Sequence, residues 1–532
     1  MAEHLRFLPA GSDAFLVELD DLAITLSLLG GLLAARPAGV IELVPAARTL
    51  MVRFDPFVTD QAHLVPVISR IDLSVRGTRR GQTFEIPVAY DGEDLVDVAE
   101  TLGWKVEELI RRHTEATYTV AFTGFAPGFA YLTCDDIHFD VPRRTSPRVR
   151  IPAGSVALGG KFSGIYPVDS PGGWQLLGRT PLKMWDVNRR RAALLAPGDT
   201  VGFREIGKGA FFSVAVNLEK QMETAGPAAG LVVTRADGPV LYQDLGRPGR
   251  ADQGVAESGA LDRASLIGAN LCVGNRRDAA GIEIVFGGFG LKADRPVTLA
   301  VTGAPAPISI RTADGRIVPA PFGRPFALDA GDDLTLGLPP EGMRSYLALR
   351  GGFAVEALLG SASSDTLARI GPAPITMGDL LVPANEPAAS VDPFRAAQVS
   401  LPKAGETVTL DIVLGPRTDW FSDKGVKQLL SQKWQVTAES SRVGMRLAGA
   451  EPLQRRNAAE LPSEGTAIGS IQVPHSGEPV IFLADHPLTG GYPVIGVVAR
   501  HHLDLAGQIP IGANIRFNAI AAFDPLIMEI NR

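Results

Sequence analysis

The chain of 532 residues is predicted to be mainly β with an α/β portion at its start. Short apolar runs separated by Gly, Pro and Asp turns fill most of its length, as in barrels and sandwiches. Strands alternate with helices only in the first eighty residues. Apolar residues make up 45% of the chain, which is enough to fill a core in each of three or four domains.

Residues 1–80 are predicted to form a small ferredoxin-like α/β domain. The apolar run at 22–35 is a helix bounded by charged residues, and it is too short to cross a bilayer. The other predicted elements are strands at 13–19, 39–46 and 48–55 and a second helix at 63–73. This order of strands and helices is typical of a single layered sheet with helices on one face.

Residues 81–216 are predicted to form a β-barrel. Two helical segments with apolar stripes lie within 94–116, and residues 122–180 then combine Gly, Pro and aromatic residues with almost no helical periodicity. That stretch fits either a barrel with tight corners or a ligand groove floored by backbone amides. The residues that we expect to bind substrate or nucleotide there are Phe125, Tyr131, Ser155, Tyr166, Gly172 and Gly173.

The second half begins after a predicted linker at 217–229, where small residues and one Pro replace the β pattern. Residues 230–390 and 391–532 are each predicted to form a barrel, because short strands recur with turn signals between them. One clear helix lies at 261–274. A second change in composition at 383–403 marks the join between the two barrels.

Charge and cysteine content exclude several classes. The net charge of −7 provides no global attraction to nucleic acid or to an anionic membrane. Cys134 and Cys272 are far apart and form no CxxC pattern, so neither a disulfide framework nor a structural zinc site is indicated. With no signal-peptide pattern at the start, we expect a cytoplasmic protein.

Common catalytic motifs are missing. Gly159, Gly160 and Lys161 suggest a phosphate loop, but Phe162 follows and the first Gly is misplaced. No GxGxxG opens a helix after a strand, no GxSxG elbow is present, and no zinc spacing such as HExxH occurs. We therefore predict no metal site, and we interpret His501 and His502 as structural or exposed.

Residues 471–517 hold the best candidates for proton transfer. His475 lies on a predicted turn, and Asp485 ends an apolar strand, so both side chains are well placed at the mouth of a cleft. The alternative is that both hydrogen-bond loop backbone. The loop that follows adds Thr489, Gly490, Gly491 and Tyr492 as binding candidates, whereas His486 is interpreted as structural or exposed.

Residues 257–283 hold a third set. Ser258 turns the chain, and Asp262 is predicted to cap the following helix, whose N-terminus presents amides to an anion or a carbonyl. Glu283 lies in an apolar strand, where a carboxylate needs a partner or a raised pKa, and it is a candidate general base. Arg344 and Arg442, with Arg446, suit a carboxylate or phosphate, although surface ion pairs are the common fate of Arg.

These segments resemble a known family. Residues 124–132 (GFAPGFAYL), IPAGSVALGG and SGIYPVDSPGGWQLLGRT are similar to the B component of bacterial 5-oxoprolinase, also known as the kinase inhibitor KipI. ESGALD, GMRSYLALRGG, VPHSGEPVIFLAD and TGGYP are similar to the C component, or KipA. The pair also resembles the carboxyltransferase region of urea carboxylase, and older naming calls the parts allophanate hydrolase subunits 1 and 2. The resemblance implies cyclophilin-like barrels and a natural B–C fusion.

The resemblance implies three functions. In the first, ATP, with Mg²⁺, activates the carbonyl of 5-oxoproline, and ring opening to glutamate is completed by a separate 5-oxoprolinase A subunit. In the second, carboxybiotin delivers a carboxyl group to urea or a related amide, which requires a biotin carboxylase and a biotinylated carrier that this chain does not contain. In the third, the protein is a non-enzymatic regulator of a kinase. A homo-oligomer is compatible with each of them.

Overall fold

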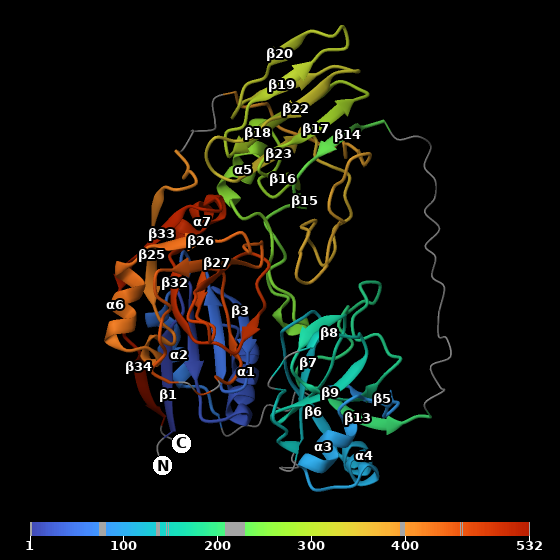
Figure 1. The fold of residues 1–532 in the computed structure, drawn as a ribbon, viewed down its shortest axis with the longest axis vertical. Coiled ribbons are helices and arrows are strands. Elements are labelled where there is room, and N and C mark those ends of the chain that lie inside the picture. The colour runs from blue at the N-terminus through green and yellow to red at the C-terminus, as the bar shows by residue number, and fades with distance from the viewer. Residues whose placement is uncertain are drawn as a thin grey trace.

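The computed structural model describes residues 3–73, 81–134, 139–144, 146, 148–207, 229–393, 400–457, 459 and 461–530. An N-terminal α/β domain, a first barrel, a second barrel and a third barrel follow one another along the chain. The second barrel stands at one end of the molecule, and the other three parts are grouped at the opposite end (Figure 1). Strands dominate, as the sequence predicts.

The N-terminal α/β domain is a five-stranded antiparallel sheet of order β3-β4-β2-β1-β34 with two helices. Its elements are β1 (Glu3–Pro9), β2 (Ala14–Glu18), α1 (Leu22–Ala35), β3 (Val40–Pro45), β4 (Thr49–Phe54), α2 (Gln61–Ser69) and β34 (Leu526–Ile530). The Asp21 side chain caps α1 by accepting a hydrogen bond from the Ile24 amide, and the helix ends at Arg36 in a left-handed conformation with φ 44°. Leu28 and Leu32 pack into the core beneath the sheet.

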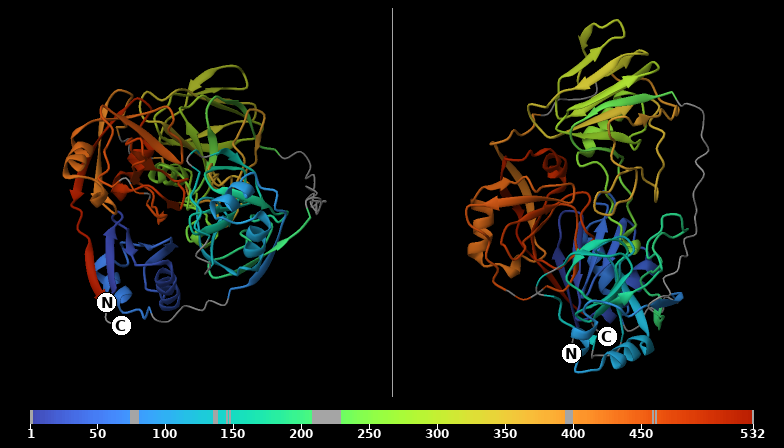
Figure 2. Two further views of the ribbon diagram at one scale, coloured as in Figure 1. Left: turned by 60° about the horizontal axis from the view of Figure 1, so that its bottom comes forward. Right: turned by 45° about the vertical axis from the view of Figure 1, so that its right-hand side comes forward.

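One boundary predicted from the sequence is wrong. β34 was expected to belong to the last barrel, but it pairs antiparallel with β1 from Glu3↔Ile530 to Phe7↔Leu526. The described ends of the chain therefore lie side by side in Figure 1 and in both views of Figure 2. A strand can join any sheet edge that leaves backbone groups free, and sequence periodicity does not say which edge it joins.

The first barrel is a seven-stranded sheet of order β12-β9-β10-β7-β6-β13-β5. Its elements are β5 (Thr83–Val88), α3 (Leu95–Thr101), α4 (Val106–Glu115), β6 (Tyr118–Thr123), β7 (Ala130–Thr133), β8 (Arg148–Ile151), β9 (Ser155–Gly159), β10 (Phe162–Ile165), β11 (Ser170–Gly172), β12 (Gln175–Arg179) and β13 (Thr200–Glu205). A bridge between Ala89 and Arg179 brings the two edges together, so the sheet is nearly closed. The predicted linker lies outside the described residues except for Ala229.

The second barrel consists of a six-stranded and a five-stranded sheet around one core. Its elements are β14 (Leu231–Ala236), β15 (Val240–Gln243), α5 (Arg263–Cys272), β16 (Gly281–Val285), β17 (Phe289–Ala293), β18 (Val297–Gly303), β19 (Ile308–Arg311), β20 (Ile317–Pro319), β21 (Pro325–Leu328), β22 (Asp333–Leu336), β23 (Arg344–Leu349) and β24 (Leu380–Leu381). The short helix η2 (Ala251–Gln253) lies outside this barrel and contacts β3 and β6. The predicted helix at 261–274 is α5, which packs on β18 and β23.

The third barrel closes completely in the order β25-β32-β29-β30-β27-β26-β33. Its elements are β25 (Thr407–Leu414), η3 (Thr418–Trp420), α6 (Asp423–Ser431), β26 (Trp434–Val436), β27 (Gly444–Gly449), β28 (Glu464–Gly465), β29 (Ser470–Gln472), β30 (Val480–Phe482), β31 (Thr489–Gly490), β32 (Val494–Val498), η4 (Arg500–His502), α7 (Leu503–Gln508) and β33 (Asn514–Ala521). Parallel pairing of β25 with β33 completes the ring.

Residues 244–262, which we call the central segment, connect the four parts. The segment leaves the second barrel and runs down between the others (Figure 1). The Ala251 carbonyl accepts a 2.8 Å hydrogen bond from Thr123 Oγ1 of the first barrel, and Gly249 N donates to Glu42 of the α/β domain at 3.2 Å. Ser258 Oγ donates to Asp485 of the third barrel at 2.7 Å. Within the described ranges, no helix is both long and apolar enough to span a bilayer.

Candidate functional site

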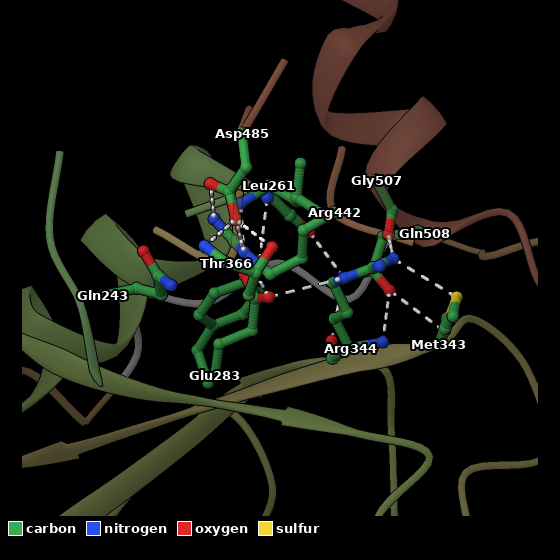
Figure 3. A network of polar contacts seen from close by, with 12 residues as sticks. Gln243, Leu261, Glu283, Met343, Arg344, Thr366, Arg442, Asp485, Gly507 and Gln508 are labelled. Carbon is green, nitrogen blue, oxygen red and sulfur yellow. Dashed lines mark hydrogen bonds and ion pairs between the residues drawn. The ribbon is translucent and has the colours of Figure 1, made fainter. Parts of the chain in front are cut away.

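A buried network of charges joins the second and third barrels. Arg442, in the loop before β27, donates from Nη1 to Glu283 of β16 at 2.6 Å. Its Nε and Nη2 donate to Asp485, which follows β30, at 3.0 and 3.1 Å, and Nη2 also donates to the Gly259 carbonyl. Figure 3 shows the guanidinium between the two carboxylates. We call Glu283, Arg442 and Asp485 the Arg442 network.

Glu283 is held in its ionised form. It lies opposite Tyr346 of β23, and its Oε2 accepts hydrogen bonds from the Tyr346 hydroxyl at 2.8 Å and from the Leu261 amide at 3.1 Å. Burial raises the pKa of Glu283, but Arg442, Arg344 and these hydrogen bonds outweigh it, so the pKa falls below its ordinary value. From its place in an apolar strand, this carboxylate was predicted to have either a charged or hydrogen-bonding partner or a raised pKa. The structure provides partners, so Glu283 is unsuited to act as a general base near neutral pH.

Asp485 is likewise saturated with donors. It is fully buried, and besides Arg442 it accepts hydrogen bonds from Ser258 Oγ and from the amide and hydroxyl of Thr366 at 2.9 and 2.7 Å. Burial raises the pKa of Asp485, yet Arg442 and these donors lower it overall. A carboxylate with every acceptor position occupied holds domains together rather than accepting a proton. The prediction of a catalytic Asp485 is therefore not favoured by its surroundings.

Asp365 is the acidic group that sequence reasoning missed. It is buried in the loop beside Thr366, and its Oδ1 accepts from the Leu367 and Ala368 amides at 3.0 and 2.8 Å. Burial, and the charge of Asp485 next, raise the pKa of Asp365 to about 7. A carboxyl group that titrates near neutral pH suits general acid–base catalysis. The only feature of the sequence that could have pointed to Asp365 is the Ser- and Asp-rich run at 361–365.

The remaining candidates of the second barrel have structural partners. Asp262 caps α5 as predicted, because its side chain accepts from the Ser265 amide at 2.9 Å, and Gln508 donates to its other oxygen. Arg344 is buried, donates to the Gly507 carbonyl and lies 3.5 Å from Glu283. Arg446 is exposed and forms a surface ion pair, as is common for Arg. Arg344 and Arg442 instead form buried ion pairs.

His475 does not meet Asp485. Its side chain is exposed, and its ring packs edge-on against Tyr492 with centroids 5.4 Å apart. The guanidinium of Arg455 lies 5.4 Å from the centre of the Tyr492 ring. His475 and Tyr492 thus lie exposed on the third barrel, with the half-buried Arg455 beside Tyr492. His486 is buried instead, stacks on Phe482, and has its pKa lowered to about 4 by burial, which agrees with a structural role.

The Gly-rich stretch of the first barrel forms hairpins covered by an aromatic layer. Tyr131, Tyr166 and Trp174 are buried in one cluster with Phe129. Phe125 has φ 63° in the tight loop after β6, and its ring packs on Phe129 and Tyr166. A bulky residue held at positive φ is uncommon and marks a loop whose shape matters.

Small residues allow close approach around this layer. A Cβ on Gly172 would lie 2.4 Å from the Tyr166 hydroxyl, and one on Gly124 would lie 2.3 Å from Thr489 Oγ1. Ser155 is buried within β9, and the Gly173 carbonyl accepts from the Arg144 amide. The backbone at Gly172 is therefore covered by Tyr166 of the same barrel and the backbone at Gly124 by Thr489 of the third barrel, so neither position is open to a ligand.

The loop from Thr489 to Tyr492 lies where the first and third barrels meet. Thr489 is buried beside Gly124, and Gly490 pairs with Glu464 in the short sheet of β28 and β31. A Cβ on Gly491 would lie 3.4 Å from the Leu461 carbonyl. Thr489 therefore contacts the first barrel, whereas Tyr492 is exposed and packs against His475.

One side-chain group in the described part of the chain has metal-like spacing, and it consists of Asp411, His501 and His502. His502 Nδ1 already accepts a 2.8 Å hydrogen bond from the Asp411 amide, so its lone pair is in use. His501 Nε2 lies 2.9 Å from an Asp411 oxygen. These bonds account for the three residues without a metal ion.

Comparison with known proteins agrees with this architecture. Residues 253–519 match the carboxyltransferase domain, subdomain A and B, and residues 5–195 match the carboxyltransferase domain, subdomain C and D. The chain belongs to the carboxyltransferase domain family. In this family's terms, the α/β domain and first barrel form one half, and the second and third barrels form the other. The Arg442 network lies within the subdomain A and B half.

Individual relatives cover both halves. The C component of 5-oxoprolinase from Escherichia coli is 34% identical over 290 residues, which is 54% of this chain and 90% of the relative. The B component from Haemophilus influenzae is 41% identical over 168 residues, which is 31% of this chain and 78% of the relative. Urea amidolyase from Saccharomyces cerevisiae is 33% identical over 290 residues but is matched over only 16% of its length. The crystal structure of TTHA0988 aligns with a TM-score of 0.82 and 33% identity over 95% of this chain and 99% of that one.

Proposed function

We propose that this carboxyltransferase-family chain is the fused B–C component of an ATP-dependent 5-oxoprolinase. The observation that carries the proposal is that both halves match 5-oxoprolinase subunits over most of those subunits' lengths, in one chain. The central segment bonds the two halves together through Thr123 and Glu42, so they act as one unit. The partner would be a separate A subunit in the cytoplasm.

The proposed chemistry follows from the weak electrophilicity of a lactam. The lactam oxygen bonds to the γ-phosphorus of ATP while the bond to ADP breaks, which makes that oxygen a leaving group. Water then adds to the activated carbon, the ring C–N bond breaks, and a second water releases phosphate from the acyl phosphate to leave glutamate. We assign the first step to this chain and ring opening to its combination with the A subunit.

Within this chain, Asp365 is our candidate for proton transfer. It titrates near neutral pH and sits beside the Arg442 network, which holds Thr366 and the central segment in place. The lactam N–H must lose a proton when its oxygen is phosphorylated, and a carboxylate with a pKa near 7 can accept one. Asp365 therefore replaces Asp485 and His475 in this role.

The test is a reconstituted reaction. Purified chain, 5-oxoproline and Mg-ATP are assayed for ADP and glutamate with and without a 5-oxoprolinase A subunit. We expect lactam-dependent ADP release from the chain with 5-oxoproline and Mg-ATP, and glutamate release only when the A subunit is added. Both should fall by at least about 100-fold in Asp365→Asn and stay unchanged in Asp314→Asn, an exposed turn residue. ADP release that ignores 5-oxoproline would contradict the proposal.

The family match and the amidolyase relative favour one second candidate, a biotin-dependent carboxyltransferase component acting on urea or a related amide. In that case a carboxylated biotin carrier from another chain would supply the carboxyl group. Stimulation of carboxybiotin decarboxylation by urea, together with no ADP release from 5-oxoproline, would favour this candidate over the first.

A further inference from the structure

We propose that the large cavity along α1 binds a nucleoside triphosphate, with its base and sugar against α1 and β3 and its phosphates beside Arg36 and Arg250. This inference rests on the proposed ATP-dependent function and adds the place where the nucleotide is held. No phosphate-loop motif is present in the sequence, so any nucleotide must be held by another arrangement.

The cavity has a volume of about 1040 Å³ and lies between three parts of the molecule. Residues 27–36 of α1 and its cap line one side, which at 1.5 Å per residue gives a length of about 14 Å. Residues 249–253 of the central segment and Pro197 of the first barrel line the other sides. A site of this length suits an extended ligand better than a single small ring.

The wall from the α/β domain is apolar. Leu29 and Leu33 of α1 and Ile41 of β3 line the cavity, and Leu33 and Ile41 remain 41% and 40% exposed. Side chains of this kind on two adjoining elements leave an apolar surface for a planar group. A purine base and its sugar would cover this surface.

Two guanidinium groups line the same cavity. Arg250 donates from Nη2 to the Leu359 carbonyl at 3.0 Å, while its Nε is buried with no hydrogen-bond partner among the described residues. Arg36 has no ion pair with any residue in the described ranges. Guanidinium groups with unused donors are the preferred partners of phosphate oxygens. The carbonyl end of α1 repels anions, and Arg36 stands at that end, where its charge offsets the repulsion.

Glu42, Asp72 and Asp252 are the carboxylates that line the cavity among the described residues, and each interacts with other groups of the protein. Glu42 lies 3.6 Å from Arg53 and accepts from Gly249 N, and Asp252 lies 3.6 Å from Arg191. The charges of Glu42 and Asp252 are therefore offset by Arg53 and Arg191, whereas Arg36 and Arg250 are left to attract an anion. The buried Gln253 also lines the cavity and adds an amide for a polar contact.

Arg36 provides a clean variant. Its backbone has φ 44°, a conformation that favours Gly, so Arg36→Gly removes the guanidinium without adding strain. Arg250→Gln removes the second guanidinium but also its hydrogen bond to the Leu359 carbonyl, so weaker binding in this variant could reflect a local change of fold. Weaker binding in Arg36→Gly as well would not have that explanation. Arg70→Gln, at the exposed end of α2 in the same domain, is the matched control.

The experiment measures binding without turnover. Full-length protein is titrated with a fluorescent ATP analogue, and ATP, adenosine and inorganic triphosphate are tested as competitors. A photoreactive 8-azido-ATP label is then mapped by mass spectrometry. We expect at least fivefold weaker binding in Arg36→Gly and Arg250→Gln, unchanged binding in Arg70→Gln, the strongest competition from ATP, and a label within residues 22–45.

A label elsewhere, or unchanged binding in both cavity variants, overturns the cavity assignment while leaving a 5-oxoprolinase function intact. Inorganic triphosphate competing as well as ATP reduces the cavity to an anion site and overturns the nucleotide proposal. Correct labelling without any lactam-dependent ADP release leaves the nucleotide site standing and contradicts the proposed function.

Discussion

The Arg442 network and the cavity along α1 use the same side chain in opposite ways. Arg442 is buried between Glu283 and Asp485 with all its nitrogens engaged. Arg250 and Arg36 line a cavity without a carboxylate partner in the described ranges. A guanidinium whose donors are all used fixes the arrangement of domains, whereas one with unused donors can hold a ligand.

Buried carboxylates in this molecule differ in whether their neighbours hold them ionised. The sequence suggested proton transfer at Asp485 and Glu283 because both carboxylates end or interrupt apolar strands. Both carboxylates are fully buried, but the surrounding donors lower the pKa of each and hold it ionised. Asp365, one residue from Thr366 and with fewer donors, has its pKa raised instead.

Replacing Arg442 by Met should have the largest effect. Removing Arg442 leaves the buried Asp485 without an ion-pair partner and leaves Glu283 with Arg344 alone, at 3.5 Å, which typically costs about 3–5 kcal/mol. We expect a fall of several degrees in Tm, measured by differential scanning calorimetry. The exposed Arg446→Met variant should lie within about 0.5 kcal/mol of wild type.

A triple variant checks this assignment. Adding Glu283→Gln and Asp485→Asn to Arg442→Met neutralises both carboxylates and should restore a large part of the lost stability. A triple variant that is less stable than Arg442→Met alone would show that the network is not held together by charge.

The second prediction concerns pH. The pKa of Asp365 is about 7 in the folded protein and near 3.9 when unfolded, so between these values the folded state binds the extra proton. The stability that this proton provides is complete below about pH 4 and is lost as pH rises through 7, by on the order of 2–4 kcal/mol. Asp365→Asn should therefore become more stable relative to wild type as pH rises.

Thermal unfolding at pH 5 and pH 8 measures this difference. Asp314→Asn, on an exposed turn, should show no such change. Equal Tm differences for Asp365→Asn at the two pH values would mean that Asp365 is ionised in the folded state, and its proposed role would fail with it.

The smallest effect is expected for Arg36→Gly. Relief of the left-handed strain and the larger entropy of the unfolded Gly chain nearly cancel, so the free energy of unfolding should change by less than about 1 kcal/mol. Loss of several kcal/mol on denaturant unfolding would show that Arg36 serves the fold, and the contrast with Arg442 would disappear.

The sequence allowed much of the fold to be predicted, for local reasons. The helix at 22–35 matches α1 at both ends because Asp21 caps it and its apolar run is bounded by charge. α5 and the cap at Asp262 were predicted for the same reason. β34 was misplaced because its partner, β1, lies more than 500 residues away in the chain.

Candidate residues were harder to assign. Glu283, Arg344, Arg442 and Asp485 were each singled out, and the structure places all four together, yet no pattern in the sequence indicated that they neutralise one another. His475 and Asp485, ten residues apart, were expected to act together and instead lie one exposed and one buried.

The sequence by itself therefore determined the β class, the α/β start, the main helices and their caps, and the family resemblance. These depend on periodicity and turn chemistry within a few residues. Only the tertiary structure decided which charges are saturated, which carboxyl group titrates near neutral pH, and where a cavity opens between domains. The physical reason is that desolvation and pairing depend on neighbours in space, and the central segment brings together residues from all four parts of the chain.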